Sequence, residues 1–334
     1  MLFSVVVPVY NEAAVLRAFW DRLSGVLKQV GCGWEVLFVN DGSRDGTPEL
    51  LAELSGQEPR IKVLSFSRNF GHQAAITAGL DFAAGDAVAM MDADLQDPPE
   101  LLPKMLDLYE QGYEVVSAQR VSRRGDNWLK RKTATLFYWV MRRAMSERLP
   151  PEVGDYRLFS REALAAVRGF REQHRFMRGL VAWLGLKEAI VPFDRERRFE
   201  GESKYPLLKM LRLSWTGISS FSAMPLRIAT LCGFTLCFIA FGYFLYVLYG
   251  VFVSRNVVPG WASLAALQCL FSGITLVCVG LTADYVARIY DESKNRPLYI
   301  VSGMTNMSRP DVTPPRAVVC CRDPVGTATK GAPR

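Results

Sequence analysis

Histidine and metal-binding cysteine patterns are scarce in this 334-residue sequence. It holds two histidines and seven cysteines, and no cysteine has zinc-ligand spacing with a histidine. The cysteines therefore indicate a reduced protein without disulfides. The 40 basic and 33 acidic residues give a net charge of +7, but they form no block or module typical of nucleic-acid binding. Phosphate ligands or an anionic membrane surface explain the positive excess better.

The amino terminus lacks the features of a signal peptide. No basic residue precedes its first apolar run, and Pro8, Asn11 and Glu12 interrupt that run. We therefore expect residues 3–9 to form a first buried strand.

Up to about residue 120, strand patterns alternate with helix patterns. Strands are predicted at 3–9, 34–39, 61–66, 87–91 and 114–118, and helices at 13–30, after the turn at 41–47, at 73–84 and from Pro98 onward. Apolar strands joined by helical crossovers predict an α/β fold with a mostly parallel sheet that is covered on both faces. A further, exposed strand is predicted at 189–199.

Long apolar segments without charge distinguish the second half of the chain. Residues 228–253 and 261–283 are each long enough to cross a membrane, and 205–224 form an amphipathic pattern that suits a helix in the interface. Basic residues outside the pair of segments predict that both termini and the α/β domain are cytoplasmic, with a bacterial inner membrane favoured. The predicted units are a cytoplasmic α/β domain at 1–204, an interface helix region at 205–226, a two-helix transmembrane hairpin at 227–287, a juxtamembrane segment at 288–301 and a disordered tail at 302–334.

The stretch 90–100 places two carboxylates directly after a predicted buried strand. Asp92 and Asp94 stand at the carboxyl end of the strand at 87–91, which is where open α/β sheets bind ligands. Together with the amide oxygen of Gln96 they are hard ligands that suit Mg²⁺ or Mn²⁺ shared with a substrate phosphate. An acidic surface turn that caps the next helix would use the same residues, and the spacing alone leaves both alternatives open.

Two other predicted strands also end in polar residues. Tyr10 and Glu12 follow the first strand, and Asp41 follows the second. An aromatic wall and carboxylates suit the base and ribose of a nucleotide. Each residue alone could belong to an ordinary turn or helix cap, but three acidic clusters at one sheet edge favour a nucleotide site.

These motifs together resemble family 2 glycosyltransferases of the GT-A fold. The resemblance rests on residues 8–12, 40–43, 68–71, 92–100, 154–158 and 292–297 with Arg198 and Lys204, and it covers roughly residues 3–300. It points to the branch that uses polyprenyl phosphate acceptors, which includes dolichyl-phosphate mannose synthases and bactoprenol glucosyltransferases. The two apolar segments favour the bactoprenol type.

The resemblance implies an inverting, metal-dependent transfer of a hexose from a nucleotide sugar to undecaprenyl or dolichyl phosphate. UDP-glucose is the favoured donor and GDP-mannose the alternative. The implied metal ligands are Asp92, Asp94 and Gln96, and the implied donor contacts are Pro8, Tyr10, Glu12, Asp41, Asp92, Ala93 and Arg120. The implied acceptor-phosphate contacts are Arg131, Arg198 and Lys204, and the implied catalytic residues are Asp94, Asp155, Arg198 and Lys204. Asp155 would orient the sugar or assist deprotonation; a structural role in holding Arg157 is the alternative.

Two other functions remain open from the sequence. A processive polysaccharide synthase would carry a Gln-x-x-Arg-Trp signature, and the nearest match, at 173–176, lacks the spacing. A non-catalytic partner subunit is disfavoured by the intact Asp92, Asp94, Arg198 and Lys204. A homo-oligomer is a further open alternative. We interpret His72 as a polar residue at a helix start and not as a catalyst.

Overall fold

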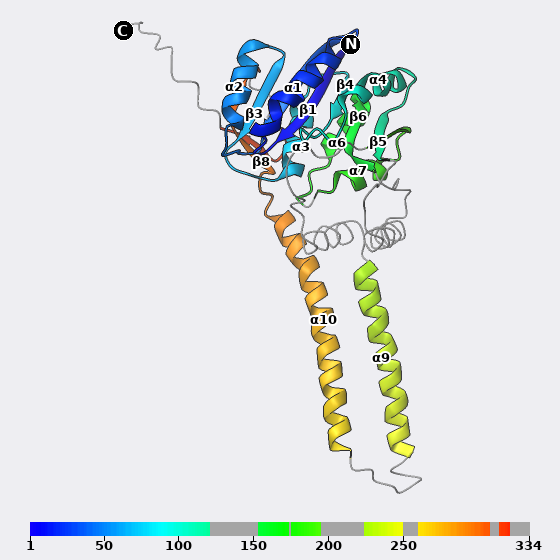
Figure 1. The fold of residues 1–334 in the computed structure, drawn as a ribbon. Helices are drawn as coiled ribbons and strands as arrows, with labels where there is room; N and C mark the ends of the chain where they lie inside the picture. The colour runs from blue at the N-terminus through cyan, green and yellow to red at the C-terminus, as the bar shows by residue number, and fades with distance from the viewer. Residues whose placement is uncertain (121–152, 174, 195–223, 250–259, 308–313, 321–334) are drawn as a thin grey trace, which may run out of the picture.

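The computed structural model describes residues 1–120, 153–173, 175–194, 224–249, 260–307 and 314–320, and these include one mixed β-sheet and two long helices that extend from it (Figure 1). The strands are β1 (Leu2–Val9), β2 (Gly33–Asn40), β3 (Ile61–Phe66), β4 (Ala87–Met90), β5 (Val115–Arg120), β6 (Val153–Ser160), β7 (Glu188–Phe193), β8 (Tyr299–Thr305) and β9 (Ala317–Val319). Their order in the sheet is β7-β5-β6-β4-β1-β2-β3-β8-β9.

Parallel pairing dominates the sheet, as the alternation of strand and helix patterns predicts. In the described part of the chain, five of the eight strand pairings are parallel, and β6 and β8 pair antiparallel with their neighbours β4, β5 and β3. The predicted α/β class with a mostly parallel sheet is confirmed.

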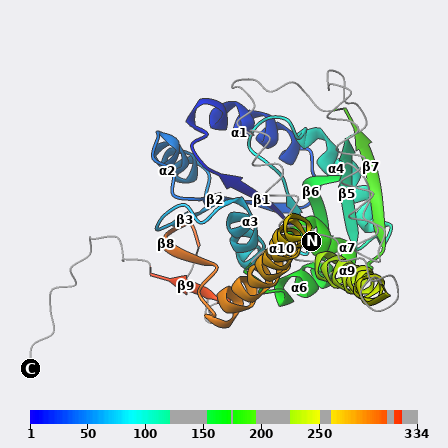
Figure 2. The ribbon, with the colours of Figure 1, turned by 90° about the horizontal axis from the view of Figure 1, so that it is seen from below.

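The helices cover both faces of the sheet (Figure 2). They are α1 (Ala13–Leu27), α2 (Thr47–Gln57), α3 (His72–Phe82), the 3₁₀ turn η1 (Pro99–Leu101), α4 (Leu102–Glu110), α6 (Arg161–Gly169), α7 (Met177–Leu184), α9 (Met224–Tyr249) and α10 (Trp261–Ser293). Residues of α1, α2 and α4 pack on one face, and residues of α3, α6 and α7 pack on the other. The central strands are mostly apolar because helices cover both of their faces, and the few polar residues in them, such as Ser4 and Glu35, are buried.

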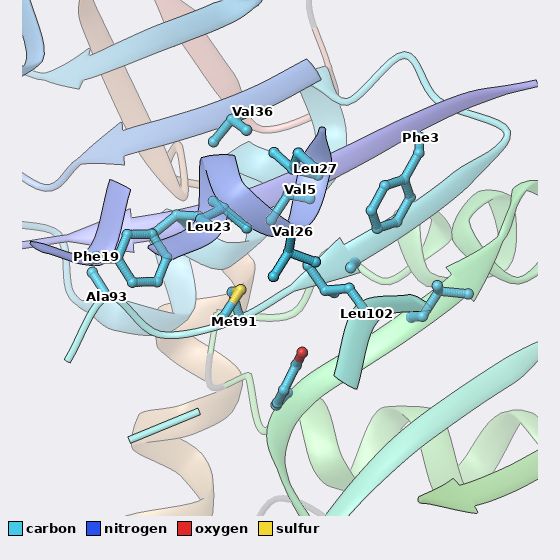
Figure 3. Packing of buried hydrophobic residues seen from close by; sticks show 14 of the residues in the cluster. Phe3, Val5, Phe19, Leu23, Val26, Leu27, Val36, Met91, Ala93 and Leu102 are labelled. Carbon is cyan, nitrogen blue, oxygen red and sulfur yellow. The ribbon is translucent and has the colours of Figure 1, made fainter. Parts of the chain in front are cut away.

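The core on the α1 face fixes the position of the strand that precedes the acidic motif. Phe19 and Leu23 of α1 lie against Val5 of β1 and Met91, and all four are buried (Figure 3). Full burial of one such side chain contributes about 1.5–3 kcal/mol. On the other face, Gly79 lets α3 approach β1 closely, because a Cβ there would clash with Val6. This close packing directs the first residue of α3 toward the carboxyl edge of the sheet.

The chain after residue 288 departs from the prediction. The helix α10 continues to Ser293, and β8 and β9 lie in a region predicted to be mainly a disordered tail. β8 pairs with β3, and Tyr299 and Val301 of β8 are fully buried. The tail prediction was therefore wrong at these strands: its average composition concealed short apolar stretches that cover the otherwise open edge of β3.

Both long helices are rich in apolar residues, which suits a membrane environment. Among the described residues, the one stretch long and apolar enough to cross a membrane, judged by length and composition, is Leu270–Ser293. Within the described residues of α9, the apolar stretch is Ala229–Tyr243. The predicted two-span hairpin stays a prediction, and most of the predicted interface helix at 205–226 lies outside the described residues.

Candidate active site

The carboxyl edge of the sheet gathers acidic residues from two strands. Asp92 follows β4, and β6 pairs antiparallel with β4 so that Arg157 lies opposite Met90. In this register Asp155, two residues before Arg157, lies beside the chain that continues past β4. The sheet thus joins two acidic positions that are 63 residues apart in the sequence.

A histidine lies between these two carboxylates. The Nε2 atom of His72 is 3.6 Å from Oδ1 of Asp92 and 3.7 Å from Oδ2 of Asp155. Burial would lower the pKa of His72, but the nearby carboxylates of Asp155 and Asp92 raise it. The interpretation of His72 as only a helix-start residue missed this contact, because its partners are distant in sequence. The neighbouring motif at 68–71 was the available signal.

Asp155 is held as an anion from two sides. Its Oδ1 accepts a hydrogen bond from Nε of Arg178, at 3.1 Å, and its side chain is 14% exposed. Burial would raise the pKa of Asp155, but the charge and hydrogen bond of Arg178 and the proximity of His72 hold it well below its ordinary value. Among the described residues Arg178 donates this hydrogen bond, and the charge of Asp155 also acts on the buried guanidinium of Arg157, so a role in holding Arg157 stays a prediction.

Among the described residues, the carboxylates after β4 have few cationic partners, namely His72 and Arg120. Burial, and then the negative charge of Asp92, raise the pKa of Asp97 to about 7, although Arg120 opposes the shift. Oδ1 of Asp97 lies 3.6 Å from Nη2 of Arg120 and accepts no hydrogen bond within the described residues. Burial raises the pKa of Asp92 as well, and His72 opposes it; solvent weakens this effect because the Asp92 side chain is 37% exposed. A cation bound there would offset their negative charge.

The donor atoms fit a divalent metal that a substrate completes. No three His, Cys, Asp or Glu side chains of the described residues group closely enough to hold an ion alone. Mg²⁺, however, is commonly bound by one or two carboxylates together with substrate phosphates. The backbone N–H of Gln96 donates to Oδ1 of Asp94 at 3.1 Å, and Leu95 between them has a left-handed φ of 60°. This tight turn keeps Asp94 and Gln96 together.

The loops after β1 and β2 are tied to each other beside this cluster. The backbone N–H of Asn11 donates to Ser43 Oγ at 3.0 Å, and Asn11 Oδ1 accepts from the N–H of Arg44 at 2.9 Å. Tyr10 is 44% exposed, so its ring is available as a wall for a base. Glu12 precedes α1 without capping it through its side chain, and Pro8 is buried within β1.

Asp41 is buried and makes its hydrogen bonds to the backbone of a neighbouring loop. It is 3% exposed, and its two carboxylate oxygens accept from the N–H groups of Phe70 (2.6 Å) and Gly71 (2.9 Å). Burial raises the pKa of Asp41, and these hydrogen bonds oppose the rise. Gly42 makes this approach sterically possible: it has a φ of +68°, and a Cβ there would lie 2.5 Å from the carbonyl carbon of Arg68. A contact between Asp41 and a nucleotide stays a prediction.

The remaining predicted residues differ in where they lie. Arg120 ends β5 beside Asp97 and above Gly154, where a Cβ would lie 3.4 Å from its Nη2. Ala93 is buried in the core, so a donor could reach only its backbone (Figure 3). Arg131, Arg198 and Lys204 lie outside the described residues. Sequence reasoning also missed Asp97 and Arg178.

Comparison with known proteins gives consistent results. The family model described as Glycosyl transferase family 2 matches residues 4–168. The uncharacterized glycosyltransferase YkcC of Bacillus subtilis is 46% identical over 299 residues, which cover 90% of this chain and 93% of the relative. The bactoprenol glucosyl transferase of Shigella phage SfV is 38% identical over 90% of this chain and 98% of its own length.

Similarity to solved structures is weaker. Glucosyl-3-phosphoglycerate synthase from Mycobacterium tuberculosis in complex with UDP shares 20% identity, with a TM-score of 0.46 over 66% of this chain and 78% of that one. A similarity of this size carries no conclusion about this chain.

Fold and site together define an α/β protein with a candidate ligand site at the carboxyl edge of its sheet, where Asp92 after β4 and Asp155 of β6 lie on either flank of His72. The two sequence relatives specify it further, because each aligns with nearly the whole chain. The chain belongs to glycosyl transferase family 2, and the family assignment made from its motifs is confirmed. It is a glycosyltransferase.

Proposed function

We propose that this enzyme transfers a hexose from a nucleotide sugar to polyprenyl phosphate, with inversion at the anomeric carbon and with a divalent cation. UDP-glucose is the favoured donor and undecaprenyl phosphate the favoured acceptor. Several relatives with 36–38% identity are named bactoprenol glucosyl transferases, and they support both choices. The observation that carries the proposal is the state of Asp155 between Arg178 and His72.

Asp155 is suited to binding but is a poor proton acceptor. Arg178 donates to it and His72 lies beside it, and together they hold its pKa well below the ordinary range. A sugar hydroxyl acceptor would need a general base with a pKa near the working pH. A lipid phosphate, whose second pKa is about 6, is already largely ionised at neutral pH and needs none. The site therefore suits a phosphate acceptor.

The reaction then depends mainly on positioning and charge. An oxygen of the lipid phosphate attacks the anomeric carbon while the bond from that carbon to the nucleoside diphosphate breaks, and the diphosphate leaves with the electron pair. A bound Mg²⁺ or Mn²⁺ would neutralise the departing diphosphate. Asp92, Asp94 and Gln96 would hold this ion, and Asp155 would accept hydrogen bonds from sugar hydroxyls.

Basic residues would bring the two anions of the reaction, the donor diphosphate and the lipid phosphate, together. Arg120 lies beside the acidic cluster and would contact the donor diphosphate. Arg131, Arg198 and Lys204, which lie outside the described residues, would contact the acceptor phosphate. Arginine suits this role because its planar guanidinium can donate two hydrogen bonds to one phosphate.

The acceptor also determines where the enzyme works. We propose two spans, 228–253 and 261–283, and a catalytic domain on the cytoplasmic face; the apolar stretch of α10 supports the membrane location. Reporter fusions test this topology. A reporter enzyme that works only outside the cytoplasm should be active when it is inserted in the loop at 254–260. A reporter that works only inside the cytoplasm should be active when it is fused to the carboxyl terminus. The reverse pattern, or two cytoplasmic reporters, would contradict the proposal.

A purified-component assay tests the reaction. The full chain in detergent is mixed with undecaprenyl phosphate, Mg²⁺ or Mn²⁺, and a panel of UDP- and GDP-sugars. We expect nucleoside diphosphate to appear with UDP-glucose only when lipid phosphate and metal are both present. A polymeric product would indicate a processive synthase, and no release with any donor would refute the proposal.

A further inference from the structure

His72 is placed by contacts from several parts of the sheet edge. Asp41, at the end of β2, holds the N–H groups of Phe70 and Gly71, and α3 begins at the next residue. At the other side of the first turn, Gln73 accepts a hydrogen bond from the N–H of Met177 at 3.2 Å, which joins α3 to α7. The histidine ring is thereby directed at the ends of β4 and β6.

The ring does not serve the helix or the core. The N-cap of α3 is Gly71, and no side chain caps this helix end. The His72 side chain is 45% exposed, so it adds little to the packed interior. Nε2 of His72 lies instead within ion-pair distance of the carboxylates of Asp92 and Asp155.

We propose that His72 is a positioning residue of the transfer reaction, fixing the carboxylate of Asp92 on the donor side relative to the carboxylate of Asp155 on the sugar side. This inference rests on the proposed function, which assigns the two sides. The distances of 3.6 and 3.7 Å bring Nε2 of His72 within ion-pair range of both carboxylates. Without the histidine, mutual repulsion would separate the two carboxylates.

The pair of variants His72→Leu and His72→Gln separates positioning from packing. Leucine keeps the bulk of the ring but donates no hydrogen bond, whereas the glutamine amide can place an N–H near the position of Nε2. We expect His72→Leu to lower kcat by about 10- to 100-fold. The KM for undecaprenyl phosphate should stay near that of the wild type, and His72→Gln should recover most of kcat. Thermal midpoints of both variants should match the wild type.

A double-mutant cycle shows whether His72 acts through Asp155. His72→Leu is combined with Asp155→Asn, and kcat is compared among the wild type, both single variants and the double variant. If His72 positions Asp155, the double variant should lose about as much as Asp155→Asn alone, because the two residues act as a unit. Losses that multiply would overturn the proposal.

Binding of the donor provides a readout that does not depend on the acceptor. Calorimetric titration with UDP-glucose, other UDP-sugars and GDP-sugars in the presence of Mn²⁺ should show weaker binding to His72→Leu and nearly normal binding to His72→Gln. Unchanged binding together with unchanged kcat would refute positioning by His72. A wild type that binds a donor but does not turn over with lipid phosphate would refute the proposed function, and the binding result would then decide the role of His72.

Discussion

The two edges of the sheet treat their buried charges in opposite ways. At the amino edge, Glu35 accepts hydrogen bonds from Ser4 Oγ at 2.6 Å, from the N–H of Ala84 at 2.9 Å and from Lys62. At the carboxyl edge, Asp97 lies near Asp92, and one of its oxygens accepts no hydrogen bond from the described residues. Within the described residues, the buried carboxylate at the amino edge has its hydrogen bonds satisfied by the protein, and the one at the carboxyl edge does not.

The pKa values follow this difference. Burial would raise the pKa of Glu35, but the bonds from Lys62, Ser4 and Ala84 lower it below its ordinary value. At Asp97 burial dominates and the pKa rises to about 7. A buried polar group without a partner costs about 1–3 kcal/mol, so such groups persist where a ligand compensates for them. The amino edge thus stabilises the fold through its own hydrogen bonds, whereas the carboxyl edge keeps a carboxylate oxygen without a hydrogen bond from the described residues, which fits the substrate site proposed there.

The largest expected effect lies at the carboxyl edge. Asp94→Asn should lower turnover by about 10³-fold or more, because a neutral amide holds a divalent cation poorly and the leaving diphosphate loses its counter-charge. The thermal midpoint should not fall. Nucleoside diphosphate release and thermal unfolding of the same preparation measure both, with the exposed Asp107→Asn as control. Undiminished turnover would support a non-catalytic scaffold.

The next effect lies at the amino edge and concerns stability. Glu35→Leu should lower the free energy of unfolding by about 2–4 kcal/mol, since it leaves the Ser4 hydroxyl, the Ala84 N–H and Lys62 without their acceptor. Because Lys62 is partly exposed, Lys62→Met should cost less and serves as the matched comparison. Thermal unfolding monitors stability, and kcat per folded molecule should be unchanged. A large loss of kcat in Glu35→Leu would break the division between the edges.

A smaller effect concerns the pH dependence of stability. Aspartates usually stabilise a fold more as pH rises, and Asp97 should do the opposite. Unfolded aspartate ionises near pH 4, whereas Asp97 in the fold ionises near 7. Between these values the unfolded chain has already lost a proton that the folded chain keeps, so stability falls as pH rises through this window. Asp97→Asn should therefore be more stable than the wild type at pH 8, by about 1–2 kcal/mol, and not at pH 4. Thermal unfolding across pH tests this, and an equal gain at both pH values would contradict the assignment.

The last expected effect, similar in size to that of Asp97→Asn, is that of Ser4→Ala. Ser4 Oγ donates to Glu35 and accepts from the N–H of Gly85 at 2.8 Å, so the variant removes two bonds of the amino-edge network. We expect a loss of about 1–2 kcal/mol in the free energy of unfolding and no change in kcat. Thermal unfolding of Ser4→Ala in a Glu35→Leu background should show a smaller additional loss, because most of the network is already gone. Full additivity would show that the network is not cooperative.

The sequence predicted the parallel half of the sheet better than the antiparallel half. Predicted strands at 3–9, 34–39, 61–66, 87–91 and 114–118 match β1 to β5 within a residue or two, because buried parallel strands are continuous apolar runs. The strand β6 carries Asp155 and Arg157 within its apolar residues, and its pattern was not recognised as a strand. The strands β8 and β9 were missed because each is short and gains its partner only in the folded sheet.

The sequence predicted which acidic residues form the candidate site, but it did not predict which residues contact them. Asp92, Asp94 and Asp155 were singled out from motifs, but the contacts of His72 and Arg178 with Asp155 join positions 83 and 23 residues apart. No local pattern specifies such pairs, because they arise from the register between β4 and β6 and from the packing of α3 and α7. The hydrogen bonds of Asp41 were likewise not predictable from the local sequence, because its partners, the N–H groups of Phe70 and Gly71, lie in another loop.

The strand β8 has a consequence for the order of synthesis. It closes the edge of β3 and follows α10 in the chain, so a ribosome makes β1 to β7 and both long helices before this strand exists. During that interval the hydrogen-bonding groups of β3 that later face β8 have no strand partner, and such open edges are prone to pair with other chains. The nascent enzyme is therefore most exposed to misassembly just before its last segments emerge.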